Sequence, residues 1–325
     1  MKIAVLKEQA KGELRVAATP DTVKKFIDAG AKVSVETGAG EGSSIADAAY
    51  KDVGASIHKS LAETVKGADV VLAVQGPEGE ALATLPKGTH LIAMLNPLGD
   101  KKYSDALAKH GLTAFAMELM PRISRAQAMD VLSSQSNLAG YRAVIDAGAA
   151  FGKATPMMMT AAGTVAPAKV LVLGAGVAGL QAIATAKRLG AVVSAFDVRP
   201  AVKEQVESLG AKFVEVLSEE TEGAETAGGY AKEMSEDYKR KQSELIHETC
   251  KKMDIVITTA LIPGKPAPVL ISEEMVKDMK PGSVIVDLAV TAGGNCPLSK
   301  ADKEVVKGGV KILSYTNVPS RVVVD

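Results

Sequence analysis

The feature that most constrains this 325-residue chain is a glycine-rich turn between two apolar runs. Residues 170–173 have the length of a buried strand, and Gly174, Gly176 and Gly179 follow in GxGxxG spacing before a helical pattern that ends at Leu189. In such a unit the first glycine permits a tight turn, the second lets a pyrophosphate approach the backbone, and the third lets helix and strand pack closely. The pattern predicts a dinucleotide-binding Rossmann unit, rather than a packing contact that merely tolerates glycine.

A carboxylate at the end of the second apolar run predicts which dinucleotide binds. Asp197 lies at the expected distance of about 20 residues, where it can accept both ribose hydroxyls of an adenosine. A carboxylate repels a 2′-phosphate, so Asp197 favours NAD(H); Arg199 lies close by and weakens this preference without overturning it. The free N–H groups of the helix N-terminus face the phosphates. The predicted cofactor contacts here are Gly174, Gly176, Val177, Ala178, Gly179, Asp197, Val198 and Arg199.

Composition excludes several function classes. Lysine plus arginine equal aspartate plus glutamate at 38 each, so no excess of charge attracts nucleic acid, and with 3% aromatic residues and no tryptophan there is little to stack on bases. Cys250 and Cys296 lie far apart and outside any CxxC, which argues against disulfides and cysteine metal sites and fits a reducing compartment. The four histidines form no spaced cluster, so no metal site is predicted.

No signal peptide or membrane span is expected. The N-terminus reaches a charge too soon for a signal peptide, and the nearly uncharged run 170–186 is explained by the strand–turn–helix pattern.

Alternation of strands and helices predicts doubly wound parallel sheets of the α/β class with helices on both faces, and the length allows two domains. The first covers residues 1–133 and the second, the NAD(H)-binding domain, covers 134–317, with the tail 318–325 heading back to the first. An alanine-rich helix over 134–155 is expected to cross between them, and the methionine run after it to serve apolar packing. The turn 260–268 follows a predicted strand at its carboxyl end, so Ala260 and Leu261 are expected to line the cofactor.

Two polar segments interrupt the alternation. The first, 121–143, contains Arg122, Gln127, Asp130 and Ser133 among apolar residues, and we interpret it as a binding loop at a domain edge rather than as a solvated linker. The second, 218–244, is charged and holds Gly229 and Tyr230; its residues fit an exposed insertion, a mobile flap or a disordered loop equally well.

The sequence contains none of the common catalytic motifs. No Ser-His-Asp set, HExxH, nucleophilic cysteine or Walker loop occurs. Hydride transfer to a carbonyl or imine needs a proton donor and a cation that holds the substrate. Transfer from one nicotinamide directly to another needs neither, so it fits a site made of hydrogen-bonding groups.

Nearly end to end, the chain resembles the NAD(H)-binding component of the proton-translocating nicotinamide nucleotide transhydrogenases. The resemblance is carried by PRISRAQ at 121–127, GYR at 140–142, AGLQAIATAKRLG at 178–190, TTALIPGKPAP at 258–268 and GGNC at 293–296. It implies two Rossmann-like doubly wound domains joined by long helices, with NAD(H) in the cleft. It also implies a homodimer formed with help from residues 157–164, and a peripheral place on the cytoplasmic face of the inner membrane. The implied partners are a membrane-spanning proton channel and a separate domain that binds NADP(H).

The resemblance also implies residue roles. Arg122, Gln127, Asp130 and Ser133 would hold the nicotinamide end as the catalytic loop, with Gln127 reaching toward the NADP(H) ring on the partner. Tyr230, preceded by Gly229, would belong to a mobile loop that closes over the nucleotide, which favours the flap interpretation of 218–244.

Two other functions stay open. The first half is also similar to alanine dehydrogenase, through Lys7-Glu8, Arg15 and Thr19-Pro20, but the lysine and histidine which that enzyme needs are replaced by Gln75 and Asn96. A non-catalytic NAD-sensing protein is the third possibility. The family's chain continues with a further helix, whereas this sequence ends at Asp325, so we expect apolar surface on the first domain to be exposed.

Overall fold

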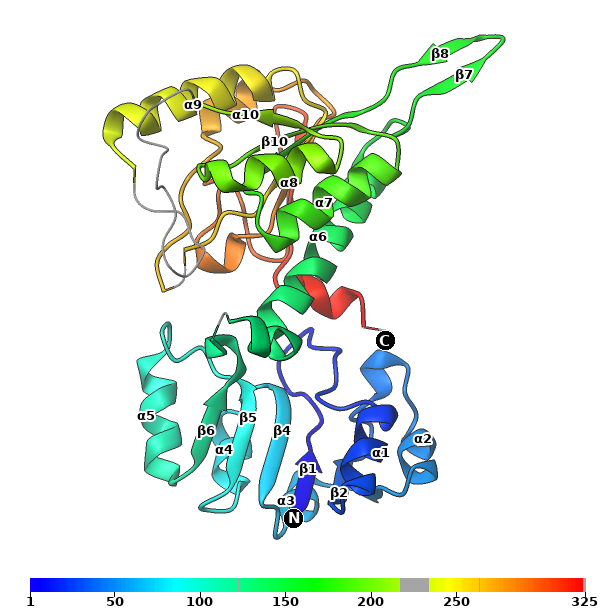
Figure 1. The fold of residues 1–325 in the computed structure, drawn as a ribbon, viewed down its shortest axis with the longest axis vertical. Helices are drawn as coiled ribbons and strands as arrows, with labels where there is room; N and C mark the ends of the chain where they lie inside the picture. The colour runs from blue at the N-terminus through cyan, green and yellow to red at the C-terminus, as the bar shows by residue number, and fades with distance from the viewer. Residues whose placement is uncertain (122, 217–233, 263, 324–325) are drawn as a thin grey trace. The chain divides into compact units, whose positions relative to one another are not determined.

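The computed structural model describes residues 1–121, 123–216, 234–262 and 264–323. The chain divides into two compact units: the first unit is Met1–Leu132 together with the last residues from Ser320, and the second unit is Ser133–Pro319. Each unit is built on a sheet of parallel strands flanked by helices (Figure 1). The predicted α/β class with Rossmann-like sheets is therefore confirmed.

The first unit holds a six-stranded sheet in the order β3-β2-β1-β4-β5-β6, with every pairing parallel. Its strands are β1 Lys2–Val5, β2 Lys32–Glu36, β3 Ser56–His58, β4 Val70–Gln75, β5 His90–Met94 and β6 Thr113–Ala116. Its helices are α1 Pro20–Asp28, α2 Asp47–Asp52, α3 Leu61–Val65, α4 Gly79–Thr84 and α5 Lys101–His110, with short 3-10 turns at Glu41–Ser43, Met117–Leu119 and Ser124–Met129. Local signals set the ends: Thr19 caps α1 ahead of Pro20, and Gly111 ends α5 with φ of 69°.

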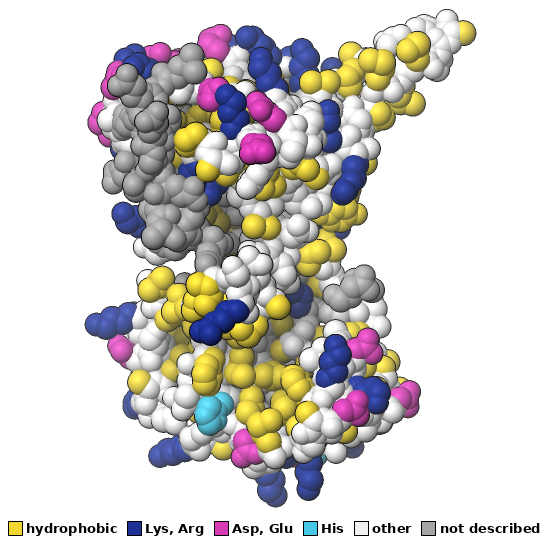
Figure 2. All heavy atoms as spheres, in the orientation of Figure 1, with side chains coloured by type: hydrophobic (Ala, Val, Ile, Leu, Met, Phe, Trp, Pro, Cys, Tyr) yellow, Lys and Arg dark blue, Asp and Glu magenta, His cyan; other side chains and the backbone are white. Residues whose placement is uncertain are grey.

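Alternate residues of these strands enter two cores. One face packs Val71, Leu91 and neighbours against α3, α4 and α5, and the other packs Val5, Val33 and neighbours against α1 and α2. On the second face, however, the β4–β5–β6 half is only partly covered. Figure 2 shows apolar side chains gathered there. The His90 ring of β5 stacks on Phe115 of β6. The half-exposed or exposed residues are Val70, Leu72, Val74, Ile92, Met94 and Phe115. This part of the sheet therefore differs from most parallel sheets, in which helices cover both faces.

The second unit holds a seven-stranded sheet in the order β11-β10-β9-β12-β13-β15-β14. Its strands are β9 Lys169–Leu173, β10 Val192–Phe196, β11 Lys212–Val214, β12 Ile255–Thr258, β13 Val284–Asp287, β14 Lys303–Lys307 and β15 Val310–Ser314. Only the edge strand β14 pairs antiparallel among these described strands. The helices are α6 Val131–Ala150, α7 Val177–Arg188, α8 Lys203–Ser208, α9 Glu236–Cys250 and α10 Glu273–Asp278, with 3-10 turns at Pro200–Val202, Val290–Ala292 and Val318–Arg321.

Residue alternation again separates two cores. Val170, Val172 and Ile257 face α6, α7 and α8, whereas Leu171 and Leu173 face α9 and α10. Strand β9 is therefore buried on both faces, as a near-continuous apolar run predicts for the middle of a parallel sheet.

Two elements differ from the predicted ones. Helix α6 ends at Ala150 instead of continuing to 155, because Gly152 and Pro156 interrupt the helical pattern. The methionine run then forms a β-hairpin, β7 Met158–Thr160 with β8 Gly163–Val165, which projects from the second unit (Figure 1). All six of its strand residues are exposed, so the residues that the structure describes do not provide the expected packing of the methionines.

Candidate nucleotide-binding site

The glycine-rich turn lies at the point where the strand order of the second sheet reverses. Strand β9 pairs with β10 on one side and β12 on the other, so the chain connections leave in opposite directions from this point. Ligands of open α/β sheets bind in the crevice outside the carboxyl ends of strands at such a reversal. Gly174 directly follows β9 and Ala260 lies just beyond β12. The fold thus brings the two predicted segments to one edge.

The three glycines serve three distinct structural purposes. Gly174 has φ of 98°, and a Cβ there would lie 2.6 Å from the Thr259 Oγ1. A Cβ on Gly179 would lie 1.8 Å from the Gly174 carbonyl oxygen, so glycine is required for α7 to pack on the turn. Gly176 is different, because its φ of −76° suits any residue and a Cβ would meet no atom within 4 Å. The space beside Gly176 is open, as close approach by a pyrophosphate requires.

Helix α7 presents its N-terminus to this space. Gly176 is the N-cap residue and makes no side-chain capping hydrogen bond, so the first N–H groups of α7, including those of Val177 and Ala178, are available to an anion. Helix α6 lies close by, since a Cβ on Gly140 would approach the Ala178 carbonyl oxygen to 2.1 Å. Asn137 of α6 also donates from Nδ2 to Gln181 Oε1 of α7 at 3.3 Å.

Asp197 follows β10 directly and is held by the turn. Its Oδ2 accepts a hydrogen bond from the Ala175 N–H at 2.8 Å. Arg199 folds back onto the same carboxylate with a 2.7 Å ion pair, while Val198 packs partly against the second core of this unit. The predicted acid is therefore next to the glycine turn, and its arginine neighbour is bound to it.

The sequence analysis missed residues that shape the turn after β12. Thr259 donates from Oγ1 to the Gly174 carbonyl oxygen at 3.0 Å, tying the two turns together. Asn295 is fully buried and bonds both backbone groups of Ala260, at 3.1 Å to the N–H and 2.9 Å to the carbonyl, and also the Pro268 carbonyl. Ala260 is half-buried and Leu261 is exposed at this edge. The GGNC stretch was the available signal for Asn295.

The predicted nicotinamide loop is only partly described. Gln127 is exposed in the 3-10 turn Ser124–Met129, and Asp130 is half-buried just before α6. Ser133 lies in the first turn of α6, one turn before Asn137. Gln127 and Asp130 belong to the first unit and Ser133 to the second. Arg122, Gly229 and Tyr230 lie outside the described residues, so their predicted roles stay predictions.

The charged segment 218–244 needs one correction. Residues 236–244 are not part of an insertion or flap, because helix α9 begins at Glu236. The Ser235 hydroxyl accepts a hydrogen bond from the Tyr238 N–H at 3.2 Å, and Tyr238 is buried. A serine cap and an amphipathic face override the polar composition here.

The first unit has its own polar cluster at the carboxyl ends of β1 and β4. Glu8 accepts hydrogen bonds from the Val74 and Gln75 N–H groups at 2.6 and 3.1 Å, and burial raises its pKa to about 6. The buried Glu13 carboxylate takes a 2.6 Å ion pair from Arg15 and a 3.2 Å hydrogen bond from the Gln75 side chain. Arg15 is thus paired within the unit, and Asn96, an exposed residue with φ of 49°, brings no charge.

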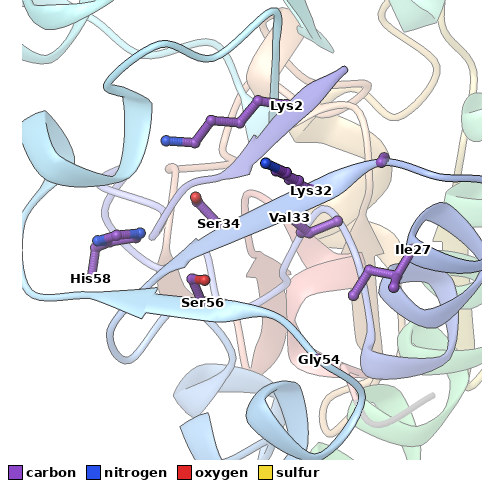
Figure 3. Close-up of a pocket in the computed structure, with 9 residues that line it drawn as sticks. Lys2, Ile27, Lys32, Val33, Ser34, Gly54, Ser56 and His58 are labelled. Atoms are coloured by element: carbon purple, nitrogen blue, oxygen red, sulfur yellow. The ribbon is translucent and has the colours of Figure 1, made fainter.

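Cysteine-based catalysis and metal binding have little support in the described residues. Burial raises the pKa of Cys250 to about 12 and also raises that of Cys296, so both thiols stay protonated at neutral pH and are poor nucleophiles. In the described part of the chain, no group of three or more His, Cys, Asp or Glu could hold a metal ion. A pocket of the first unit, lined by Lys2, Lys32 and Ser56, lies at the amino ends of β1–β3, opposite the edge where such sheets bind ligands (Figure 3).

Family comparisons agree with this geometry. The profile "Alanine dehydrogenase/PNT, N-terminal domain" matches residues 4–139, and "Alanine dehydrogenase/PNT, C-terminal domain" matches 143–325. The chain belongs to the alanine dehydrogenase/PNT family.

Two relatives within this family are named as transhydrogenases. The chain is 62% identical over 330 residues to an NAD(P) transhydrogenase subunit alpha protein from Rhodospirillum rubrum, covering 100% of this chain and 86% of that protein. The solved structure of transhydrogenase from Sinorhizobium meliloti matches with a TM-score of 0.90 and 52% identity, covering 99% of this chain and 88% of that one. The alanine dehydrogenase of Halomonas elongata is 32% identical over 99% of this chain and 82% of its own length.

Membership in the alanine dehydrogenase/PNT family implies NAD(H) binding, which the turn around Gly176 can accommodate. Among the residues that the structure describes, no helix is long and apolar enough to span a bilayer.

Proposed function

We propose that this chain is the NAD(H)-binding component of a proton-translocating transhydrogenase, which passes a hydride from NADH directly to NADP⁺ held by a partner component. The observation that carries the proposal is the open space at Gly176 beside Asp197 and the α7 N-terminus, in a chain that is 62% identical to a transhydrogenase alpha subunit along its whole length. NAD(H) supplies the hydride; the residues of this chain bind and orient it.

Each predicted contact then has a part in holding the nucleotide. The turn from Gly174 to Gly179 and the α7 N-terminus would bind the pyrophosphate, and Asp197 the adenosine ribose. Val198 and Arg199 would lie along the adenosine, and Ala260 and Leu261 along the nicotinamide half. Arg122, Asp130 and Ser133 would fix the nicotinamide, Gln127 would face the partner's ring, and the loop with Gly229 and Tyr230 would close over the site.

The proposed assembly has three further parts. An NADP(H)-binding domain receives the hydride, a membrane-spanning component moves the proton, and this chain sits peripherally on the cytoplasmic face of the inner membrane. A second copy of the chain would pair through the β7–β8 hairpin. The hairpin exposes Met157, Met158 and Met159 by 56%, 51% and 73%, and adaptable methionine surfaces of this kind suit an interface between subunits.

An alanine-dehydrogenase-like activity is the alternative, favoured by the family and by Arg15. The contacts of Arg15 argue against it, because the guanidinium is paired with Glu13, and Gln75 and Asn96 supply no cation and no proton. A non-catalytic NAD-sensing protein would use the same turn and differ only in lacking transfer.

One assay separates these functions. NADH oxidation is measured with a purified NADP(H)-binding transhydrogenase component and NADP⁺, and in parallel with pyruvate and ammonia alone. Turnover only with the partner is expected. Turnover with pyruvate and ammonia would identify an amino-acid dehydrogenase instead, and NADH binding without turnover in either assay would favour the sensing role.

A further inference from the structure

The Asp197 carboxylate is already fully bonded within the protein. It receives hydrogen bonds from four N–H groups: the Ala175 backbone at 2.8 Å, the Arg199 backbone at 2.9 Å, and the Arg199 Nε and Nη2 at 2.9 and 2.7 Å. The pair is well shielded, with side-chain exposures of 6% for Asp197 and 14% for Arg199. A carboxylate offers about four lone-pair sites, so these donors occupy its accepting capacity.

Arg199 therefore takes the place of a ribose. A guanidinium fork presents two parallel N–H donors to a carboxylate, and the 2′- and 3′-hydroxyls of an adenosine ribose would present two O–H donors to the same oxygens. The two backbone donors belong to the segments that follow β9 and β10 and can stay, but the Arg199 fork and the ribose hydroxyls cannot bond Asp197 at the same time.

We propose that Arg199 is a displaceable latch on the ribose site, which NAD(H) must open and which sets the preference between NAD(H) and NADP(H). The proposal rests on the proposed NAD(H) function. When NAD(H) binds, its ribose hydroxyls replace the fork on Asp197. The ion pair is lost in that exchange, so the latch weakens NAD(H) binding.

The effect on a 2′-phosphorylated nucleotide is opposite in sign. A 2′-phosphate is an acceptor and an anion, so it cannot donate to Asp197 and is repelled by it. Arg199, while present, offsets that repulsion and can pair with the phosphate bidentately. The same side chain thus opposes the binding of NAD(H) and tolerates that of NADP(H). Its loss should therefore strengthen NAD(H) binding without strengthening NADP(H) binding.

The test is the equilibrium binding of NADH and of NADPH to the full chain and to Arg199→Leu, by titration calorimetry. We expect the Kd for NADH to fall about tenfold, the factor for one charge-assisted hydrogen bond that no longer has to be broken. The Kd for NADPH should not fall, so the ratio of the NADPH Kd to the NADH Kd rises by at least about tenfold. Arg199→Lys keeps the charge without the fork, and it should tighten NADH binding less while leaving NADPH binding close to wild type.

Lys203→Met is the matched control. Lys203 lies four residues further along and pairs with Glu215 at 2.5 Å, so its loss removes a positive charge without touching Asp197. The ratio of the NADPH Kd to the NADH Kd in Lys203→Met should stay within about twofold of wild type. An equal shift in Lys203→Met would overturn the latch in favour of general electrostatics.

A fall in NADH affinity in Arg199→Leu, with a thermal unfolding midpoint near wild type, would also overturn the latch, since Arg199 would then be a direct ligand. Parallel changes for NADH and NADPH would show a merely structural role. If wild type itself binds no NADH, the proposed function fails before the variants are compared; if wild type binds NADH and the ratio does not move, only the latch is wrong.

Discussion

Among single residues, the contrast between Gly176 and Gly179 separates binding from folding. A methyl group at Gly176 would enter open space, whereas one at Gly179 would collide with the Gly174 carbonyl oxygen. We expect Gly176→Ala to change the free energy of unfolding by no more than about 1 kcal/mol and to weaken NADH binding at least about tenfold. Gly179→Ala should lose about 3 kcal/mol or more of stability.

Urea denaturation and NADH titration of both variants measure these effects. Gly152→Ala is the matched control, because Gly152 has no positive φ and a methyl group there would meet no atom within 4 Å. Gly152→Ala should bind NADH as wild type does. Unimpaired NADH binding in Gly176→Ala would show that the pyrophosphate does not approach this turn.

The residues that sequence reasoning found are those whose role is local. Gly174, Gly179 and Asp197 follow strand ends at fixed spacing, so the pattern alone predicts their positions. Asn295 and Thr259 were missed because their partners, Ala260 and Gly174, are brought near only by the folded sheet. The Arg199 fork was noted only as a nearby charge, since its direction is set by packing around Asp197.

Glu8 predicts a pH-dependent stability of the first unit. Burial raises its pKa from 4.5 to about 6, so the folded chain binds the proton more tightly than the unfolded chain does. The stabilisation is complete below pH 4.5 and is lost as the pH rises through about 6. The charged groups facing Glu8 are Glu13, which raises its pKa, and Arg15, which lowers it.

The measurement is the free energy of unfolding at pH 4.5 and pH 7 for wild type and Glu8→Gln. Relative to the variant, wild type should lose up to about 2 kcal/mol between these pH values. An identical pH dependence in both proteins would show that Glu8 titrates normally.

Among helices and strands, those with a strong apolar period were predicted well. Strands β9 and β10 coincide, within a residue or two, with the two apolar runs that flank the glycine-rich turn. The β7–β8 hairpin and the edge strand β14 were missed because their residues are largely exposed, so no buried face marks them. Helix α9 was assigned in part to a flap because its composition is charged, although Ser235 and the buried Tyr238 set its start and its inner face.

The β7–β8 hairpin carries a prediction about assembly. If it forms the proposed dimer contact, replacing Met158 and Met159 by serine should convert the dimer to a monomer, because both side chains are more than half exposed in the single chain. NADH affinity should stay within about twofold of wild type, since the turn at Gly176 is untouched. Sedimentation velocity reports the mass and calorimetry the affinity.

Val306→Ser is the matched control for the hairpin variant. Val306 is 61% exposed on the edge strand β14, so its replacement removes a similar apolar surface elsewhere on the second unit. The control should leave the mass at that of wild type. A dimer that survives the double substitution would rule out the hairpin as the contact.

For the molecule as a whole, the proposed nicotinamide residues come from both units. The chain passes from the first unit to the second between Leu132 and Ser133, inside α6, so Gln127 and Asp130 precede the passage and Ser133 follows it. Rossmann-like topology within each unit could be predicted from strand–helix alternation. The roles of the proposed nicotinamide residues could not, because no local sequence pattern assigns a contact to each of them.

Gln127 gives the most direct test of transfer to a partner. Its side chain is exposed on the turn Ser124–Met129, so Gln127→Asn should leave the fold intact and change NADH affinity by less than about threefold. If the amide aligns the partner's nicotinamide, shortening it by one methylene should lower the rate of hydride transfer from NADH to NADP⁺ about tenfold or more, because transfer between two rings depends steeply on their alignment. Stopped-flow transfer with the purified NADP(H)-binding component measures this step. Gln205→Asn, an equally conservative change at an exposed position on α8, should transfer at the wild-type rate. Wild-type transfer by Gln127→Asn would remove Gln127 from the mechanism while leaving NAD(H) binding at Gly176 and Asp197 in place.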